Sequence, residues 1–197
     1  MTSHRLRLIL WVLVAIAAVG GILVALQPPS PNSRETGLAT IGGPFTLTAG
    51  DAKPFPSSRL NGKPAAIFFG FTHCPDVCPT TLARLVKLRR QLGSGDDGMS
   101  IVFITVDPER DGPAEVGSYA GLFGAPVVGL TGKPDDIERV KKQYGVFSQK
   151  VDQPGGSYTV DHSASVFLMD RNGHFVATLS PEEGDAVALA KLKRLQA

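Results

Sequence analysis

One stretch decides the fold of this chain: Ala65-Ala-Ile-Phe-Phe-Gly70-Phe-Thr-His-Cys74-Pro-Asp-Val-Cys78-Pro79. Its apolar start, residues 65–70, is typical of a buried strand. Leucines then recur at helical spacing and predict a helix over about residues 79–92. The two cysteines, the only ones in the chain, therefore lie at a strand-to-helix turn, where unpaired helix N–H groups favour negative charge. We expect this position to lower the thiol pKa and to favour the thiolate, which attacks disulfides and binds metals.

Strands and helices alternate after this turn. Apolar and β-branched runs predict strands at 99–106 and 127–130, and the segments 113–123 and 134–144 read as helices. Two hairpins follow, one over 146–158 and one formed by 165–169 and 174–179, and then a last helix at 182–195. A further hairpin is expected near residues 42–51. This order is that of an α/β, thioredoxin-like fold with an extra N-terminal β-hairpin and a hairpin insertion after the third helix.

The spacing of the cysteines limits their chemistry. Positions i and i+4 share one helix face, and four residues at ~1.5 Å rise place the Cα atoms of Cys74 and Cys78 about 6 Å apart. A disulfide could form at that separation, but it would close a very small loop and constrain the unfolded chain little. The pair is therefore a poor structural staple and a plausible redox or metal site. Two soft thiolates select Cu(I), zinc or an iron–sulfur cluster.

A metal held by two cysteines needs a third ligand, and the chain has four histidines. His4 precedes the N-terminal apolar run, His73 is too close to Cys74 for unstrained chelation, and His174 opens a strand after a turn. His162 lies in a predicted loop that faces the start of the first helix in a thioredoxin order. We therefore expect His162 to be the third ligand, with a purely structural histidine as the alternative. Three credible ligands favour Cu(I), or a site open for exchange, over structural zinc, which is closed by four.

Three carboxylates are candidates for the surroundings of the site. Asp161 could orient His162 or simply close a turn. Asp76, between the cysteines, could cap the helix or touch the metal. Asp107 begins the segment Asp107-Pro-Glu-Arg-Asp111, at the carboxyl edge of the sheet where ligand-binding loops gather. That segment is either a salt-bridged loop that caps the next helix or a loop that docks a partner or supports the site.

The N-terminus predicts a membrane anchor. Residues 8–26 contain no charge and no proline, and their length approaches the ~20 residues that span a bilayer. Arg5 and Arg7 precede the run, so residues 1–7 are expected to stay cytoplasmic, with 27–41 a linker and 42–197 an exported domain. A cleaved signal peptide is the alternative, but its apolar core is usually ~7–15 residues and ends at small residues. We place the domain in a bacterial periplasm, at the inner membrane, in preference to a mitochondrial inner membrane.

The charge balance excludes an electrostatic case for nucleic-acid binding. The chain has 20 basic and 18 acidic residues. Two of the basic residues, Arg5 and Arg7, precede the apolar run, which leaves 18 basic against 18 acidic residues in the remainder. A neutral domain has no basic surface of the kind that binds phosphate backbones.

Four motifs together resemble the Sco/SenC family, over about residue 42 to the C-terminus. They are Phe68-Phe-Gly-Phe-Thr-His-Cys74-Pro-Asp-Val-Cys78-Pro79, Val106-Asp-Pro-Glu-Arg-Asp111, Gly129-Leu-Thr-Gly132 and Val160-Asp-His-Ser163. The resemblance implies a thioredoxin-like fold and one copper ion, Cu(I) or Cu(II), bound by Cys74, Cys78 and His162. Two departures concern partner choice rather than the ligands: Gly112 replaces an expected threonine, and the loop between Phe147 and Tyr158 is short and rich in glycine.

The resemblance also implies a function and its partners. The expected activity is that of a membrane-anchored copper metallochaperone that supplies the binuclear CuA centre of cytochrome c oxidase subunit II, with another copper chaperone as a further partner. The alternative is a thiol–disulfide oxidoreductase that reduces the cysteines of the same acceptor, with Cys74 and Cys78 as the redox pair. The sequence leaves open which of the two activities dominates, and therefore whether the chain is an enzyme.

Overall fold

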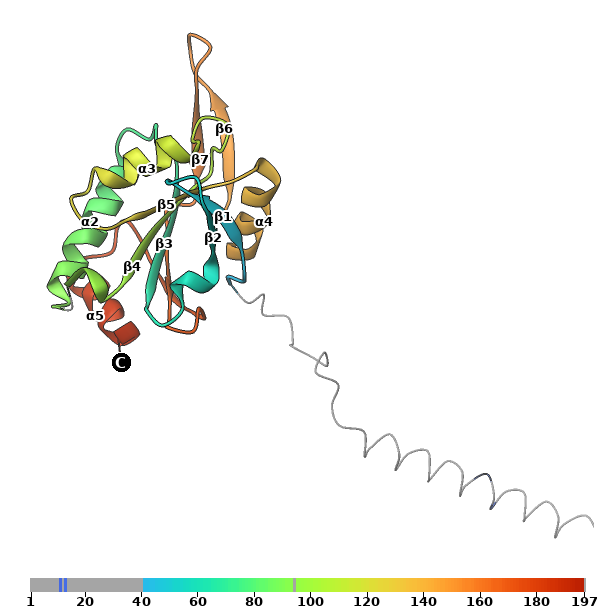
Figure 1. The fold of residues 1–197 in the computed structure, drawn as a ribbon, viewed down its shortest axis with the longest axis vertical. Helices are drawn as coiled ribbons and strands as arrows, with labels where there is room; N and C mark the ends of the chain where they lie inside the picture. Colours follow the sequence, from blue (N-terminus) through green and yellow to red (C-terminus); the bar gives the residue numbers. More distant parts are fainter. Residues whose placement is uncertain (1–10, 12, 14–40, 94, 197) are drawn as a thin grey trace, which may run out of the picture. The chain divides into compact units, whose positions relative to one another are not determined.

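The structure of the protein is a computed structural model that describes residues 11, 13, 41–93 and 95–196 (Figure 1). Residues 1–7, nearly all of the predicted anchor at 8–26 and nearly all of the linker at 27–41 lie outside the described residues. Within the described part, no helix is both long and apolar enough to cross a bilayer. Residues 40–197 form one compact unit.

A seven-stranded sheet forms the centre of this unit, in the order β2-β1-β5-β4-β3-β8-β9. The three parallel strands are β3 (Ala65–Gly70), β4 (Ser100–Thr105) and β5 (Val128–Thr131). Antiparallel strands extend both edges: β1 (Thr46–Ala49) and β2 (Pro54–Pro56) on one side, β8 (Val166–Met169) and β9 (Phe175–Leu179) on the other. Every residue of β3 is buried, as its unbroken apolar run predicts for a central strand.

Helices cover both faces of the sheet. The helices α2 (Val77–Gln91), α3 (Pro113–Gly121) and α5 (Asp185–Gln196) lie on one face, and α4 (Pro134–Tyr144) lies on the other (Figure 1). The helices α2 and α3 connect successive parallel strands, so the crossover rule places them on the same face. Short 3-10 turns at Ser57–Leu60 and Gly95–Asp97 complete the connections. The helix α4 ends at Gly145 in the left-handed conformation (φ 65°), which confirms the predicted stop.

A second, two-stranded sheet carries the predicted third ligand. The strands β6 (Ser148–Asp152) and β7 (Tyr158–His162) form a hairpin that projects past the main sheet (Figure 1). This hairpin is the predicted insertion after α4. His162 is the last residue of β7 and pairs with Ser148, so the prediction of a loop at this position is wrong. Position 162 is therefore fixed by strand pairing within the hairpin.

The thiol turn also differs from the prediction in one respect. The helix α2 begins at Val77, two residues earlier than predicted, and Cys74 lies in the turn that precedes it. The strand-to-helix turn predicted for the pair is thus confirmed for Cys74, and the i, i+4 helix geometry used to gauge their separation does not apply, because only Cys78 is in the helix. Pro79 falls in the first helical turn, where a missing N–H costs nothing because that group has no partner within the helix. The earlier start moves Cys78 into the first turn of α2.

Candidate metal centre

Three side chains from distant parts of the chain meet at one point. Cys74 comes from the turn after β3, Cys78 from the first turn of α2, and His162 from the end of β7. Their sulfur and nitrogen atoms all lie within 4.8 Å of one another, and the Cys78 Sγ is 3.5 Å from the His162 Nε2. Both cysteines are free thiols. The structure thus brings together the three residues that the sequence selects, and their role as ligands stays a prediction.

Cys74 sits at the open end of α2. Its backbone N–H donates to the Phe71 carbonyl (3.2 Å), which closes the turn, and its Sγ accepts the Cys78 N–H at 3.5 Å. The sulfur therefore takes the position at which a side chain normally caps a helix. Asp76 occupies the N-cap residue but makes no capping bond; its exposed carboxylate accepts the Thr80 hydroxyl at 3.2 Å. Cys74 is half-buried, so the centre is accessible from its side.

Cys78 is fully buried, and its environment contradicts the predicted low pKa. Burial raises the pKa of the Cys78 thiol far above its ordinary value, because a thiolate loses hydration there. Nearby Cys74 and Asp111 raise that pKa further, and the backbone hydrogen bond of Phe71 only partly opposes the effect. The sequence motif shows the helix terminus but not the burial of the sulfur, which depends on residues elsewhere in the fold. The absence of a side chain at Gly70 makes room for this sulfur, since a Cβ there would lie 2.8 Å from the Cys78 Sγ.

His162 has a defined orientation. Its Nδ1 lies 3.0 Å from the Ser163 carbonyl, so Nδ1–H donates there and Nε2 faces the Cys78 sulfur. Phe68 and Phe71 present their rings at 67° and 90° to the imidazole. Burial lowers the pKa of His162, which favours the neutral imidazole that binds metals. Asp161 is exposed and acts on His162 as a nearby charge that opposes this shift, while the Ser163 carbonyl is the group that Nδ1 meets.

Asp107 supports the fold of its own loop. It is buried, its carboxylate forms an ion pair with Arg110, and it accepts the Tyr158 hydroxyl at 2.9 Å. Among the described residues it does not belong to the group of Cys74, Cys78 and His162 that could hold an ion. The ion pair between Asp107 and Arg110 therefore agrees with the interpretation of Asp107–Asp111 as a salt-bridged loop.

Asp111, which the sequence shows only as the end of the acidic segment that starts at Asp107, anchors the thiol turn. Its buried carboxylate accepts the Thr72 N–H (2.9 Å), the Thr72 hydroxyl (2.6 Å) and the Thr105 hydroxyl (2.6 Å). These bonds fasten the turn that carries Cys74 to the end of β4. The sequence shows a threonine two residues before Cys74 and an acidic loop after the next strand. It does not specify that the carboxylate of Asp111 pairs with Thr72.

The donor set fits a soft metal ion. Two sulfurs and one imidazole nitrogen are the ligands that Cu(I) and zinc accept. Within the described residues, no further cysteine, histidine or carboxylate joins this group as a fourth ligand. His73 is exposed, and its Nδ1 meets the Thr72 hydroxyl at 3.1 Å instead. A site with three ligands, of which only Cys78 is fully buried, is better suited to an ion that exchanges than to an ion that is permanently enclosed.

Comparison with known proteins places the chain in a family. The family model described as SCO1/SenC matches residues 33–197. The mitochondrial SCO1 homologue 1 of Arabidopsis thaliana is 42% identical over 144 residues, which are 72% of this chain and 43% of that protein. The chain thus aligns with less than half the length of that relative.

Solved structures agree with this assignment. The ScoI protein of Bradyrhizobium japonicum, solved with copper bound, is 44% identical with a TM-score of 0.72, over 79% of this chain and 99% of that one. BsSco is 25% identical with a TM-score of 0.61, over 81% of this chain and 95% of that one. It is described as a member of the Sco family of cytochrome c oxidase assembly proteins, with a disulfide switch. These likenesses confirm the predicted mixed α/β, thioredoxin-like fold. The chain belongs to the SCO1/SenC family.

Proposed function

We propose that this chain binds one copper ion through Cys74, Cys78 and His162 and delivers it to the CuA centre of cytochrome c oxidase subunit II. The observation that carries the proposal is the arrangement of the three ligand atoms, all within 4.8 Å of one another. The copper bound to Bradyrhizobium japonicum ScoI supports the choice of metal. The description of BsSco as a member of a family of cytochrome c oxidase assembly proteins supports the choice of acceptor.

The differing exposure of the ligands suggests an order of exchange. Cys74 is half-buried and Cys78 is fully buried, so an incoming thiolate of the acceptor approaches from the Cys74 side. A neutral imidazole holds a soft ion less firmly than a thiolate does, so His162 leaves before Cys78. Transfer then ends with the buried Cys78 thiolate giving up the ion and taking a proton, which its raised pKa favours. A further copper chaperone is the proposed donor.

Copper titration of the reduced full-length chain tests this function. We expect one copper per chain and a loss of affinity of at least about tenfold in His162→Ala, since one of three ligands is removed. His174→Ala is the matched control, because His174 is exposed and lies outside the ligand group. If His162→Ala bound Cu(I) as tightly as the parent does, and Cu(II) as tightly as the parent does, the proposal would be contradicted.

A second activity uses the same two sulfurs. The observation in its favour is a pair of free thiols, one half-buried and one buried, with sulfurs no more than 4.8 Å apart. The Cys74 thiolate attacks an acceptor disulfide and one acceptor sulfur leaves as a thiolate. Cys78 then attacks the Cys74 sulfur, so the second acceptor sulfur is released and a Cys74–Cys78 disulfide forms. The acceptor gains two electrons and this chain loses two. Disulfide reduction that survives His162→Ala would favour this activity.

The predicted anchor completes the proposal. Residues 8–26 hold the chain in a bacterial inner membrane, residues 1–7 stay in the cytoplasm, and the domain at 42–197 lies in the periplasm on the linker 27–41. The support is the uncharged run preceded by Arg5 and Arg7. Intact mass measurement of the membrane-extracted protein tests whether the apolar run is retained as an anchor. A mature chain that begins after residue 26 would show a cleaved signal peptide instead.

A further inference from the structure

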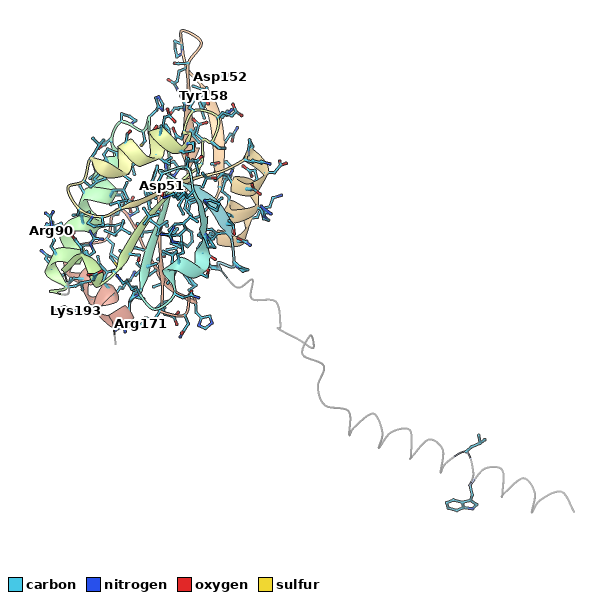
Figure 2. All side chains as sticks on the ribbon, in the orientation of Figure 1. Asp51, Arg90, Asp152, Tyr158, Arg171 and Lys193 are labelled. Carbon is cyan, nitrogen blue, oxygen red and sulfur yellow. The ribbon has the colours of Figure 1, made fainter. Side chains whose placement is uncertain are left out.

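The position of His162 relative to the two sulfurs depends on how its hairpin is attached. The strands β6 and β7 form their own sheet and share no strand pairing with the sheet that carries the thiol turn. At its base the hairpin is joined by the chain to α4 and β8, and the Ser163 N–H donates to the Phe147 carbonyl at 3.0 Å; side-chain contacts attach its outer part. Tyr158 opens β7 opposite Asp152 (Figure 2) and supplies several of them.

Arg110 contacts both the ring and the backbone of Tyr158. The guanidinium carbon of Arg110 lies 3.7 Å from the centroid of the Tyr158 ring, and its Nη1 donates to the Tyr158 carbonyl at 2.9 Å. The Arg110 Nε pairs with the Asp107 carboxylate, which in turn accepts the Tyr158 hydroxyl at 2.9 Å. Asp107, Arg110 and Tyr158 thus form a closed set of contacts, which we call the Arg110 latch. It joins the loop after β4 to the start of β7.

The same guanidinium also reaches the thiol turn. It lies 5.8 Å from the centroid of the Phe71 ring, and that ring is 5.9 Å from the His162 ring and perpendicular to it. Phe71 immediately follows β3, and its carbonyl accepts the Cys74 N–H. Arg110 is therefore in contact both with the hairpin that carries His162 and with the residue that anchors the Cys74 turn.

The contacts of Arg110 also indicate what holds it. Its Nη2 is buried and has no hydrogen-bond partner among the described residues. The guanidinium is thus placed by the Asp107 ion pair and by two aromatic rings rather than by full hydrogen bonding. Lys150 lies over the Tyr158 ring at 4.8 Å and pairs with Glu109 at 2.5 Å, but both are exposed, and exposed pairs contribute little.

We propose that Arg110 and Tyr158 are positioning residues of the metal centre: their latch holds His162 against the sulfurs of Cys74 and Cys78. The inference rests on the proposed copper binding and adds that a docked hairpin is what makes the site three-coordinate. A released hairpin would leave the two cysteines alone. Apparent affinity scales with the fraction of chains whose hairpin is docked, so a variant docked one-tenth of the time binds about tenfold more weakly.

Tyr158→Leu tests the latch, with Tyr158→Phe as the matched control. Leucine keeps apolar bulk and removes both the ring and the hydroxyl, whereas phenylalanine keeps the ring against Arg110. In copper titrations of the full-length chain we expect Tyr158→Leu to bind about tenfold more weakly and Tyr158→Phe to stay within about threefold of the parent. Copper affinity of Tyr158→Leu equal to that of the parent would overturn the inference.

A double-mutant cycle separates positioning from general damage. If Tyr158 acts through His162, then Tyr158→Leu combined with His162→Ala binds copper no more weakly than His162→Ala alone. Additive losses would show that Tyr158 acts by another route and would overturn the inference. Arg110→Lys replaces Tyr158→Leu in the cycle if the leucine variant does not fold, because it keeps the charge beside Asp107 and loses the flat stacked group.

A metal-independent measurement distinguishes failure of the latch from failure of the proposed function. In the copper-free chain, amide hydrogen exchange over residues 148–162 should accelerate at least about tenfold in Tyr158→Leu, while β4 keeps its parent rates. Unchanged exchange in the hairpin would refute the latch. A parent chain that binds no copper, with accelerated exchange in the variant, would refute copper binding and leave the latch standing.

Discussion

A side chain at Gly70 should disturb the metal centre directly. Gly70 ends β3 and is buried beneath the Cys78 sulfur. A Cβ there would lie 2.8 Å from the Cys78 Sγ, 3.0 Å from the Phe103 ring and 3.1 Å from the Phe68 ring. Comfortable contacts between such atoms begin near ~3.5 Å, so Gly70→Ala must displace the sulfur or a ring by about 0.5 Å or more.

The expected loss of stability follows from two opposing terms. Overpacking a close-packed core typically costs about 1–3 kcal/mol. Alanine also restricts the unfolded chain, which returns about 0.4–1 kcal/mol, because Gly70 is not among the glycines with positive φ. The free energy of unfolding should therefore fall by roughly 1–2 kcal/mol. Copper should also bind more weakly, because the displaced sulfur is one of the proposed ligands.

Urea unfolding of the reduced, copper-free chain measures the first effect, and copper titration measures the second. With slopes of about 2 kcal/mol/M, the midpoint should fall by about 0.5–1 M. Gly121→Ala is the control: it lies at the end of α3 with no heavy atom within 4 Å of the added Cβ, and it should gain about 0.5–1 kcal/mol. An unchanged midpoint and unchanged copper affinity in Gly70→Ala would refute the reasoning.

Three further substitutions test single features of the fold by the same urea assay. Gly112→Thr should change the free energy of unfolding by less than about 0.5 kcal/mol, because threonine and glycine are similar as N-cap residues and the new Cβ, 2.7 Å from the Glu115 Oε2, requires only that flexible carboxylate to move; a loss above about 1 kcal/mol would count against this. Tyr119→Phe should leave stability unchanged or raise it by up to about 1 kcal/mol, because the buried Tyr119 hydroxyl has no hydrogen-bond partner among the described residues; a clear loss would reveal one. Arg89→Met should lower the free energy of unfolding by about 2–4 kcal/mol, because the buried guanidinium donates to the carbonyls of Met99 and Pro126 and to the Asp96 carboxylate. An unchanged free energy of unfolding would show those hydrogen bonds to be dispensable.

The sequence predicts the elements of the site better than its environment. The alternation of apolar runs and helical patterns gives the thioredoxin order, and that order brings position 162 to the region around the start of α2. The approach of His162 to Cys74 and Cys78 is therefore predictable from topology, whereas the contacts that hold its hairpin there are not. The limits of the elements shift by a few residues: α2 starts at Val77, which takes Cys78 into the helix, while Cys74 stays in the preceding turn.

The pKa of Cys78 could not be predicted in this way. The sequence places the thiol at a helix terminus, which favours the thiolate. Its burial depends on how Gly70 and Phe103, on two neighbouring strands, pack around the sulfur. Desolvation then outweighs the helix terminus and raises the thiol pKa. A local motif shows a residue's chemical type, whereas desolvation depends on side chains from elsewhere in the fold.

The residues that hold the site in place could not be predicted from the sequence for a related reason. Arg110 and Tyr158 lie 48 positions apart, and the hairpin that contains Tyr158 makes no strand pairing with the main sheet. No periodic pattern specifies such a contact. Asp111 and Thr72 pair across a similar separation. The acidic loop after β4 is visible in the sequence as a candidate, but only the packing shows that Asp107 and Asp111 face inward as supports.

Copper coordination in the reduced full-length chain tests the central claim most directly. X-ray absorption at the copper edge, with metal analysis, should give one copper per chain with two sulfur ligands and one nitrogen ligand. His162→Ala should lose the nitrogen ligand and keep both sulfurs. A parent chain that binds no copper, or a nitrogen ligand that persists in His162→Ala, would contradict the account.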